Sequence, residues 1–350
     1  MSAKSVMDYL DKSKYEVVPL GITKEGRWLA RGDPMKELQA LARDHAPRTA
    51  SRDPGRELVA DHRELVPGVE RTGIPHVDVV FPVLHGPFGE DGTVQGLLEL
   101  ADIPYVGAGV LGSALAMDKI AMKAVFRAEG IPVADYLPIK RWDWESNPTA
   151  VVERIEEHVG YPCFVKPANL GSSVGITKVR EAGELPDALR TAARYDRKLL
   201  VEVAINAREI ECSVLGNDHP AASLPGEVIP KREFYDYVAK YFDEQTQLVI
   251  PADLTGDKTA EIQDWAVRAF LALDLAGMAR ADFFLAKDSG RVYVNELNSI
   301  PGFTHASMYP KLWEASGLPY PELLDRLIEL ALERHSDMSR RSVSYEAGNE

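Results

Sequence analysis

Segment 277–304 constrains the fold of this chain more than any other stretch. It contains two runs in which apolar and polar side chains alternate, Arg280–Leu285 and Val292–Asn298, on either side of a Lys-Asp-Ser-Gly turn. Alternation with a period of two on both sides of a glycine-containing turn predicts a β-hairpin. We expect a register that is symmetric about Ser289, and this register decides which side chains lie opposite one another.

The expected register brings polar side chains to one face of the hairpin. Asp282 lies opposite Glu296 and Arg280 lies opposite Asn298, with Val294 next in line on the same face. Two facing carboxylates repel each other, and they are costly to bury beside apolar side chains unless they have a partner. A hard divalent cation would be such a partner, with Asp282, Glu296 and Asn298 as oxygen ligands and Arg280 beside them to hold an anion. The alternative is a solvated hairpin with scattered charges.

Composition is that of a soluble globular enzyme. The 350 residues allow two or three domains, and 45% hydrophobic and 27% charged residues are ordinary values. The formal net charge of −14 argues against nucleic acid or an anionic membrane as the main partner. The two cysteines, Cys163 and Cys212, lie in apolar runs, and no run has the length of a membrane span or the pattern of a signal peptide. We expect a cytoplasmic protein with reduced, buried cysteines.

The N-terminal part has the pattern of an open parallel α/β domain, which we place at residues 1–112. A nearly continuous apolar run, Val77–Leu84, is typical of a strand buried on both faces of a parallel sheet. Periodicity predicts further elements around it: a helix within 1–12, a strand at Tyr15–Leu20, a helix at Gly92–Ala101 and a short strand at Tyr105–Val106.

The remainder predicts two further units and a tail. We expect a central subdomain at 113–198, a C-terminal subdomain at 199–335 that carries the hairpin, and a disordered tail at 336–350. A helix capped by Ser113 is expected to run to Glu129. Periodicity predicts strands at Cys163–Pro167, Ile176–Val179, Leu199–Val203 and Arg208–Leu215, and helices at Glu184–Tyr195, Thr259–Leu273 and Tyr320–Glu333.

A glycine- and serine-rich loop, Gly171–Gly175, joins two of these strands. It lacks the Gly-Lys-Ser/Thr of a Walker A loop, and no helix follows it. Its backbone N–H groups could still cover phosphates as a mobile lid, and an ordinary flexible turn is the alternative. Lys166 ends the preceding strand, where its ammonium would project toward the same phosphates or, alternatively, toward water.

Other charged residues stand at the ends of predicted elements. Lys119 and Lys123 lie four residues apart on one helix face and could meet phosphate, although a solvated pair is the alternative. Glu202 ends one strand and Glu209 begins another, where each could accept hydrogen bonds from adenine or ribose or remain exposed. His85 follows a strand at the position where open α/β sheets bind ligands, although an isolated histidine is more often structural.

Together these pieces resemble the D-alanine–D-alanine ligase family of the ATP-grasp superfamily. The resemblance covers about residues 2–335 and rests on specific motifs: H-G-P-F-G-E-D-G-T-V-Q-G, A-M-D-K, F-V-K-P-A-N-L-G-S-S-V-G, A-R-E-I-E-C-S-V-L-G, F-Y-D-Y-V-A-K-Y, A-R-A-D-F and N-E-L-N-S-I-P-G-F-T. It implies an α/β (α+β ATP-grasp) fold, with an open parallel domain followed by a two-part ATP-grasp domain. It also implies a cytoplasmic, homodimeric enzyme of peptidoglycan precursor synthesis that joins two D-alanines using ATP and two Mg²⁺ or Mn²⁺ ions.

The resemblance implies roles for the residues at matching positions. The groups implied to contact the ATP phosphates are Lys119, Lys166, Gly171, Ser172, Ser173 and, at the γ-phosphate, Lys240. Those implied to surround adenine and ribose are Glu202, Val203, Ile205 and Glu209. The implied metal ligands are Asp282, Glu296 and Asn298, and the implied oxyanion contacts are Arg280 and the Gly302 N–H. The implied D-alanine contacts are His85, Ser172, Tyr241, Ser307 and Met308.

One departure from the family lies at the N-terminus. Family members begin earlier, with a strand, a Gly-Gly loop and a glutamate that contacts the first D-alanine, whereas this sequence starts at Met1. We therefore expect an N-terminal domain without its first strand, through a misplaced start or a shortened chain. ATP and metal binding should depend less on the missing segment than D-alanine binding does. Two alternatives stay open: a D-alanine–D-lactate ligase, against which the loop containing Tyr241 argues, and a catalytically impaired nucleotide-binding homologue.

Overall fold

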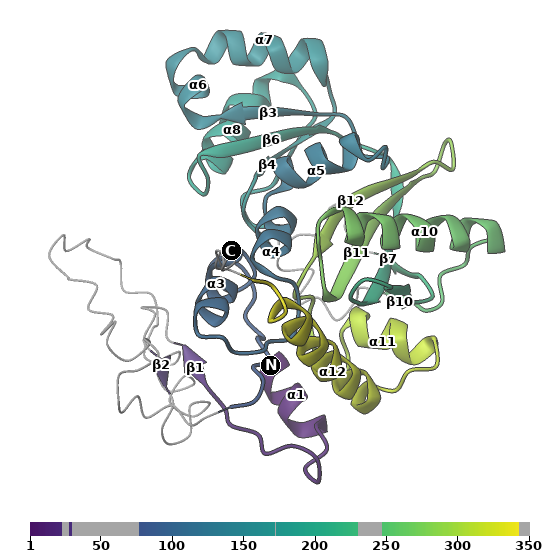
Figure 1. Ribbon diagram of the computed structural model, residues 1–350. Helices are drawn as coiled ribbons and strands as arrows, with labels where there is room; N and C mark the ends of the chain where they lie inside the picture. The colour runs from purple at the N-terminus through teal and green to yellow at the C-terminus, as the bar shows by residue number, and fades with distance from the viewer. Residues whose placement is uncertain (23–27, 30–76, 172, 230–246, 343–350) are drawn as a thin grey trace, which may run out of the picture.

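The computed structural model describes residues 1–22, 28–29, 77–171, 173–229 and 247–342 of the chain. Helices pack around two main sheets, both antiparallel, which lie in separate lobes of the molecule (Figure 1). This mixture of helices and antiparallel sheets agrees with the α/β (α+β) class expected from the sequence.

The smaller sheet has the strand order β3-β6-β4-β5. Its strands are β3 (Tyr136–Lys140), β4 (Cys163–Pro167), β5 (Thr177–Val179) and β6 (Lys198–Val203). The helices of this lobe are α6 (Arg141–Ser146), α7 (Pro148–His158) and α8 (Leu185–Ala193), the last preceded by a 3₁₀ turn at Ala182–Glu184. Odd-numbered side chains such as Val165 and Val201 pack with Ile155 and Leu189 of these helices. The even-numbered positions of β4 and β6 therefore face the other way.

The larger sheet has the order β10-β9-β7-β11-β12, with β8 paired to β7. Its strands are β7 (Ala207–Gly216), β8 (Ala221–Ala222), β9 (Gly226–Ile229), β10 (Gln247–Val249), β11 (Gly277–Ala286) and β12 (Val292–Asn298). The helices packed around it are α5 (Lys119–Ala128), α10 (Gly256–Ala272), α11 (Met308–Ala315) and α12 (Tyr320–Met338).

Alternation along β11 separates the two faces of the larger sheet. Ala281 and Phe283 point into the core that α10 and α5 cover. Met278, on the opposite face, packs into a second core with side chains of α11 and α12. Further along β11, Asp282 and Phe284 line an open cleft and belong to neither of these two cores. Asp282 therefore lies where β11 borders the cleft rather than a core.

The hairpin of β11 and β12 confirms the predicted register at its polar end and differs from it nearer the turn. Asp282 pairs with Glu296, but the register shifts after this pair, and Phe283 pairs with Val294. Asn295 is thus an extra residue, a β-bulge, in β12. Val294 consequently points into the buried core. The predicted position of Val294, on the same face as the carboxylates, is therefore wrong.

The N-terminal part contains α1 (Ser2–Tyr9), α3 (Thr93–Leu100) and the antiparallel pair β1 (Gly21–Ile22) and β2 (Trp28–Leu29). The strand predicted at Tyr15–Leu20 is not formed, and the run Val77–Leu84 makes a single parallel bridge, between Val80 and Tyr105. Within the described residues, Val77–Leu84 has no second pairing partner, which explains why its side chains are mostly half-buried.

Two helices replace the single helix predicted from Ser113 to Glu129. Asp118 separates α4 (Val110–Met117) from α5, and its carboxylate accepts hydrogen bonds of 3.1 Å from the backbone of Ile120 and Ala121. This is the geometry of an N-cap, so α5 begins at the residue after Asp118. Ser113, the predicted cap, is instead buried within α4.

The predicted boundaries also need correction. The limit at 198/199 cuts β6, which pairs with β3 and β4 in the smaller sheet. The limit at 112/113 falls inside α4, and the predicted tail begins too early because α12 continues to Met338. Cys163 and Cys212 are buried free thiols. In the described ranges, no helix combines the length and the apolar character needed to cross a bilayer.

Candidate active site

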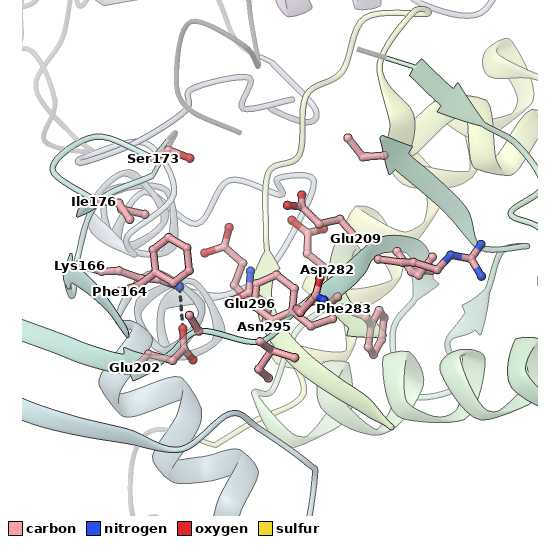
Figure 2. Close-up of a pocket in the computed structure, with 18 of the residues that line it drawn as sticks. Phe164, Lys166, Ser173, Ile176, Glu202, Glu209, Asp282, Phe283, Asn295 and Glu296 are labelled. Carbon is pink, nitrogen blue, oxygen red and sulfur yellow. Dashed lines mark hydrogen bonds and ion pairs between the residues drawn. The ribbon is translucent and has the colours of Figure 1, made fainter. Parts of the chain in front are cut away.

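A cleft with a volume of about 710 Å³ lies between the two sheets (Figure 2). Phe164, Lys166 and Glu202 of the smaller sheet form one wall, and Asp282 and Glu296 of the larger sheet lie across from them. The volume suits a ligand of small-molecule or cofactor size. The residues of the predicted site that line this cleft are Lys119, Lys166, Gly171, Ser173, Glu202, Val203, Ile205, Glu209, Asp282 and Glu296.

The wall formed by the smaller sheet contains a buried ionic triad. Lys166 Nζ donates to Glu202 Oε2 at 2.6 Å, and Lys123 Nζ lies 2.6 Å from Glu202 Oε1. The side chains of Lys123 and Glu202 are each only 1% exposed, whereas Lys166 reaches the cleft. Glu202 is thus an internal counter-ion for two lysines, and the expectation that it ends its strand as an exposed charge is wrong.

Burial and charge act in opposite directions on this triad. Burial disfavours the ionised carboxylate of Glu202, but attraction by Lys123 and Lys166 outweighs this effect and lowers its pKa to about 2. Burial lowers the pKa of Lys123, and attraction to Glu202 opposes that change. Glu202 therefore stays ionised throughout the neutral range.

Lys119 connects the two walls of the cleft. Its backbone N–H donates to the carbonyl of Ala168, and its Nζ donates to the carbonyl of Leu170 at 3.0 Å. The same Nζ lies 3.2 Å from Glu296 Oε2 on the other sheet. This ammonium therefore lies between the start of the glycine-rich loop and the acidic hairpin, where it would meet an anion.

The α8–β6 turn holds both ends of the glycine-rich loop. The Asp196 carboxylate accepts hydrogen bonds of 2.8 Å from the backbone and side-chain amides of Asn169, just before the loop. At its other end Gly175 has a φ of +75°, and a Cβ there would lie 2.6 Å from the ring of Tyr195. Only glycine combines this φ with so close an approach to a side chain. The loop is therefore held at its two ends while its middle faces the cleft.

Acidic side chains from three adjacent strands form a row across the larger sheet. Asp282 on β11 lies opposite Glu211 on β7 and opposite Glu296 on β12. Arg280 compensates the row: its Nε and Nη2 each donate to Asp282 at 2.7 Å, and Nε lies 3.1 Å from Glu211. Although burial disfavours the guanidinium charge, attraction by Asp282 and Glu211 raises the pKa of Arg280.

The donor atoms of this row fit a hard divalent cation. Asp282 and Glu296 supply carboxylate oxygens, and Asn298 is held beside them by a hydrogen bond of 3.0 Å from its Nδ2 to Asp282 Oδ2. In the described part of the chain, no three His, Cys, Asp or Glu residues form a metal-binding group by themselves. Mg²⁺ commonly takes one or two carboxylates and completes its shell with substrate phosphates, and this donor set matches that habit.

A less polar part of the cleft follows β6 and the start of β7. Phe164 and Ile176 contribute apolar surface from one side, and Val203 and Ile205 line the connection between the sheets. Glu209, at the start of β7, also lines the cleft, and Figure 2 shows it on the side of Asp282, across from Phe164 and Ile176. An apolar slot with one acidic edge suits a planar heterocycle carrying hydroxyl groups.

Of the predicted D-alanine contacts, the three that the structure describes, His85, Ser307 and Met308, are not among the described residues that line the main cleft. His85 Nδ1 lies 3.0 Å from the carbonyl of Ile300, which places the histidine beside the loop that carries Gly302. The Ser307 hydroxyl contacts Thr304 Oγ1 at 2.8 Å. A Cβ added at Gly302 would lie 3.2 Å from Ser307 Oγ. His85, Gly302 and Ser307 therefore come together.

Met308 differs from its neighbours in this group. Its side chain is buried against Val228 and Leu312 and belongs to the hydrophobic core under β9. The other predicted contacts, Ser172, Lys240 and Tyr241, lie outside the described residues.

Sequence reasoning missed two charged residues of the site. The sequence alone predicts Lys123 as a phosphate contact or a solvated lysine, whereas the side chain is buried behind the wall of the cleft. Glu211 was not singled out, yet it pairs with Arg280. The role of Glu211 becomes evident only from the pairing of β7 with β11, which places Glu211 opposite Asp282.

These features define a class of enzyme. Two antiparallel sheets face one cleft, with lysines and a glycine-rich loop on one side and a row of carboxylates on the other. This is the architecture of an ATP-grasp ligase.

Comparison with known proteins identifies the family within this class. The family described as D-ala D-ala ligase N-terminus matches residues 1–108, and that described as D-ala D-ala ligase C-terminus matches residues 125–329. The D-alanine–D-alanine ligase of Thermoanaerobacter sp. (strain X514) is 53% identical over 344 residues, which cover 97% of this chain and 94% of that protein.

Solved structures agree with these sequence matches. The structure of the D-alanine–D-alanine ligase from Coxiella burnetii superposes with a TM-score of 0.79 at 40% identity, covering 97% of this chain and 90% of that one. The VanG D-Ala:D-Ser ligase from Enterococcus faecalis superposes with a TM-score of 0.78 at 37% identity, covering 94% of each chain. The chain belongs to the D-alanine–D-alanine ligase family. The chain is therefore an enzyme of this ligase family.

Proposed function

We propose that the cleft between the two sheets is the active site of this ligase. The observation that carries the proposal is the placement of Lys119 and Lys166 on one side of the cleft and Asp282 and Glu296 on the other. Lysines bind phosphate oxygens directly, and carboxylates bind them through a divalent cation. One cavity thus contains both the lysines and the carboxylates that a binding site for a nucleoside triphosphate and its cation needs.

ATP would lie along the cleft with its adenine in the less polar part. Val203 and Ile205 would line the ring and Glu209 would lie toward the ribose, whereas Glu202, implied by the family resemblance to contact adenine, has both of its oxygens held by lysines. The phosphates would extend toward Lys119, Lys166 and the N–H groups of the Gly171–Gly175 loop. Support comes from the lining of the cavity, which combines the apolar side chains of Val203 and Ile205 with the ammonium groups of Lys119 and Lys166.

Asp282, Glu296 and Asn298 would hold the divalent cations, which we propose are two Mg²⁺ or Mn²⁺ ions. When bound, these ions neutralise charge on the phosphoryl group during its transfer. Lys119 is suited to the same task because its ammonium lies 3.2 Å from Glu296. The Lys119 ammonium would contact phosphate oxygens beside the cations and help to orient the phosphates.

The reaction would proceed in two steps. The carboxylate of the first D-alanine attacks the γ-phosphorus, and the bond to ADP breaks, which yields D-alanyl phosphate. The amine of the second D-alanine then attacks the acyl carbon, and inorganic phosphate leaves with the electrons of its C–O bond. Arg280 and the Gly302 N–H would stabilise the oxyanion of the tetrahedral intermediate. The hydrogen bonds to Asp282 use the Nε N–H and one Nη2 N–H of Arg280, and the oxyanion would be met by other N–H groups of the same guanidinium.

The two D-alanines would bind at the end of the cleft near His85. Gly302 and Ser307 cluster beside this histidine. Glu90 lies five residues after His85, and a Cβ added at Gly171 of the glycine-rich loop would lie 3.9 Å from Glu90 Oε1. From the family resemblance we include Ser172, Tyr241 and Met308 among the D-alanine contacts and Lys240 at the γ-phosphate. Water must be excluded from an acyl phosphate, and the glycine-rich loop would serve as part of the cover.

Phosphate release that depends on D-alanine, ATP and Mg²⁺ tests this proposal. Phosphate and D-alanyl-D-alanine should appear in equal amounts. D-Lactate and D-serine are offered in competition with D-alanine over a range of pH, because one of the similar structures is a D-Ala:D-Ser ligase. A mixed product as the main species would contradict the proposed specificity, and ATP binding without D-alanine-dependent phosphate release would contradict the proposed reaction.

We also propose that the enzyme is a cytoplasmic homodimer, as the family resemblance implies. Light scattering coupled to size-exclusion chromatography measures its mass in solution. A monomeric mass at the concentrations used for activity would contradict this assembly.

A further inference from the structure

Lys123 has no direct contact with the cleft, yet it belongs to the ionic triad in the cleft wall. Its Nζ lies 2.6 Å from Glu202 Oε1, and its side chain is 1% exposed between α5 and β6. Lys166 occupies the other oxygen of Glu202 and lines the cleft. A buried ammonium is costly, so a lysine in this position calls for an explanation beyond packing.

The charges of the triad supply an explanation. Glu202 carries one negative charge and is shared between two lysines, so the triad as a whole carries one positive charge. Without Lys123, Glu202 would neutralise Lys166 alone, and the wall would present no net charge to the cleft. Lys123 therefore determines whether Lys166 acts on a ligand as a cation or as half of a neutral pair.

We propose that Lys123 is a positioning residue for ATP, which binds one oxygen of Glu202 and so leaves Lys166 with uncompensated positive charge facing the phosphates. The inference rests on the proposed function, because it places the phosphates at Lys166. It extends that function by assigning a role to a residue that touches neither substrate nor cation. It also explains why Glu202 has lysines on both of its oxygens.

Two substitutions separate the charge of Lys123 from its bulk. Lys123→Met removes the ammonium and keeps an unbranched side chain, whereas Lys123→Arg keeps the charge. The double variant Lys123→Met with Glu202→Gln removes both charges of the buried pair and leaves Lys166 positive. If charge is the mechanism, the double variant regains what the single Met variant loses. If Lys123 only supports the fold, the double variant binds no better than the single one.

Binding is measured by isothermal titration of the full chain with ATP, ADP and adenosine, with circular dichroism to verify folding. We expect Lys123→Met to weaken ATP and ADP binding on the order of tenfold, with adenosine binding unchanged. We expect Lys123→Arg and the double variant to bind ATP close to the wild-type affinity. Should the single Met variant fail to fold, the comparison of the double variant with wild type still tests the charge argument.

Other outcomes would overturn the inference. Unchanged ATP affinity in Lys123→Met would show that its charge does not reach the phosphates. Equal losses for ATP and adenosine would show that Lys123 shapes the adenine end of the cleft. A double variant that binds ATP as weakly as the single Met variant would also refute it. Wild-type protein that bound no ATP would overturn the proposed function and this inference together, whereas ATP binding without D-alanine-dependent phosphate release would contradict the proposed function alone.

Discussion

Arg280 and Asp282, two residues apart on one face of β11, form a two-pronged ion pair in which Nε and Nη2 each donate a 2.7 Å hydrogen bond. Glu211 on β7 contacts the same guanidinium at 3.1 Å. The planar guanidinium matches a carboxylate in a way that a single ammonium cannot. Arg280 is therefore held rigidly beside the carboxylates of the proposed metal site.

Arg280→Lys keeps the charge and loses the two-pronged geometry. We expect kcat for D-alanine-dependent phosphate release to fall about 100-fold or more, since one well-placed donor to an oxyanion contributes that much. Steady-state kinetics with varied D-alanine measure the change. Arg291→Lys, on the exposed turn end of the same hairpin, is the matched control and should retain full activity. Equal effects from both variants would remove Arg280 from the chemistry.

Glu296→Gln tests the acidic row as a cation site. The amide keeps the shape of the side chain but loses the charge, so we expect a higher Mg²⁺ concentration for half-maximal activity and at least about a 100-fold lower rate at limiting Mg²⁺. Mg²⁺ titrations of the rate measure both quantities. Asp288→Asn, on the exposed turn of the same hairpin, should leave the titration curve unchanged. An unaltered Mg²⁺ requirement in Glu296→Gln would place the cation elsewhere.

Gly175→Ala tests how the glycine-rich loop is held. A Cβ at a φ of +75° is strained, and it would lie 2.6 Å from the Tyr195 ring. We expect the KM for ATP to rise about tenfold, from backbone strain of 1–2 kcal/mol together with the clash. Adding Tyr195→Ala should remove the clash and recover part of the loss.

Gly183→Ala is the control for this loop variant. Gly183 has an ordinary φ and open space around its Cβ position, so its substitution should leave the KM for ATP unchanged. A Gly175→Ala enzyme with wild-type kinetics would show that the loop position does not limit ATP binding.

The stability of the protein in acid should depend on Glu202. The folded-state pKa of about 2 lies below the ordinary value of 4.5, so the ionised carboxylate stabilises the fold fully above pH 4.5 and progressively less as the pH falls toward 2. The advantage of wild type over Glu202→Gln in unfolding free energy should therefore shrink over this range, by up to about 3 kcal/mol. Urea unfolding at a series of pH values measures it. A constant difference would mean that Glu202 keeps the same charge in the folded and unfolded states.

The sequence was sufficient to predict the hairpin and the polar pairs at its far end, because strand alternation is a local pattern. It was not sufficient to predict the bulge at Asn295, since nothing local distinguishes an extra residue from a regular one. The break at Asp118 was missed because apolar residues continue on both sides of it, and the capping role of the aspartate becomes evident only in the folded backbone.

Burial caused the remaining errors at the site. The spacing of Lys119 and Lys123 is the same as that of a solvated pair, and only the packing of α5 against β6 shows that one is buried. Glu211 likewise looks like one of many strand carboxylates until β7 pairs with β11. The burial of Lys123 and the position of Glu211 both depend on contacts between elements that are far apart in the sequence, and a single sequence does not show which elements pair.

Because of the bulge at Asn295, the alternation of core-facing and cleft-facing side chains changes phase within β12. Before it, Val292 and Val294 fill the core from even positions; after it, Leu297 fills the core from an odd position while Glu296 turns to the cleft. Deleting this residue would leave a strand that alternates without interruption, with Val294 still directed to the core and Glu296 still directed to the cleft. Were Asn295 instead paired as a regular strand residue, Val294 and Glu296 would lie on one face and the carboxylate would enter the core, so the site depends on the backbone conformation of this one residue.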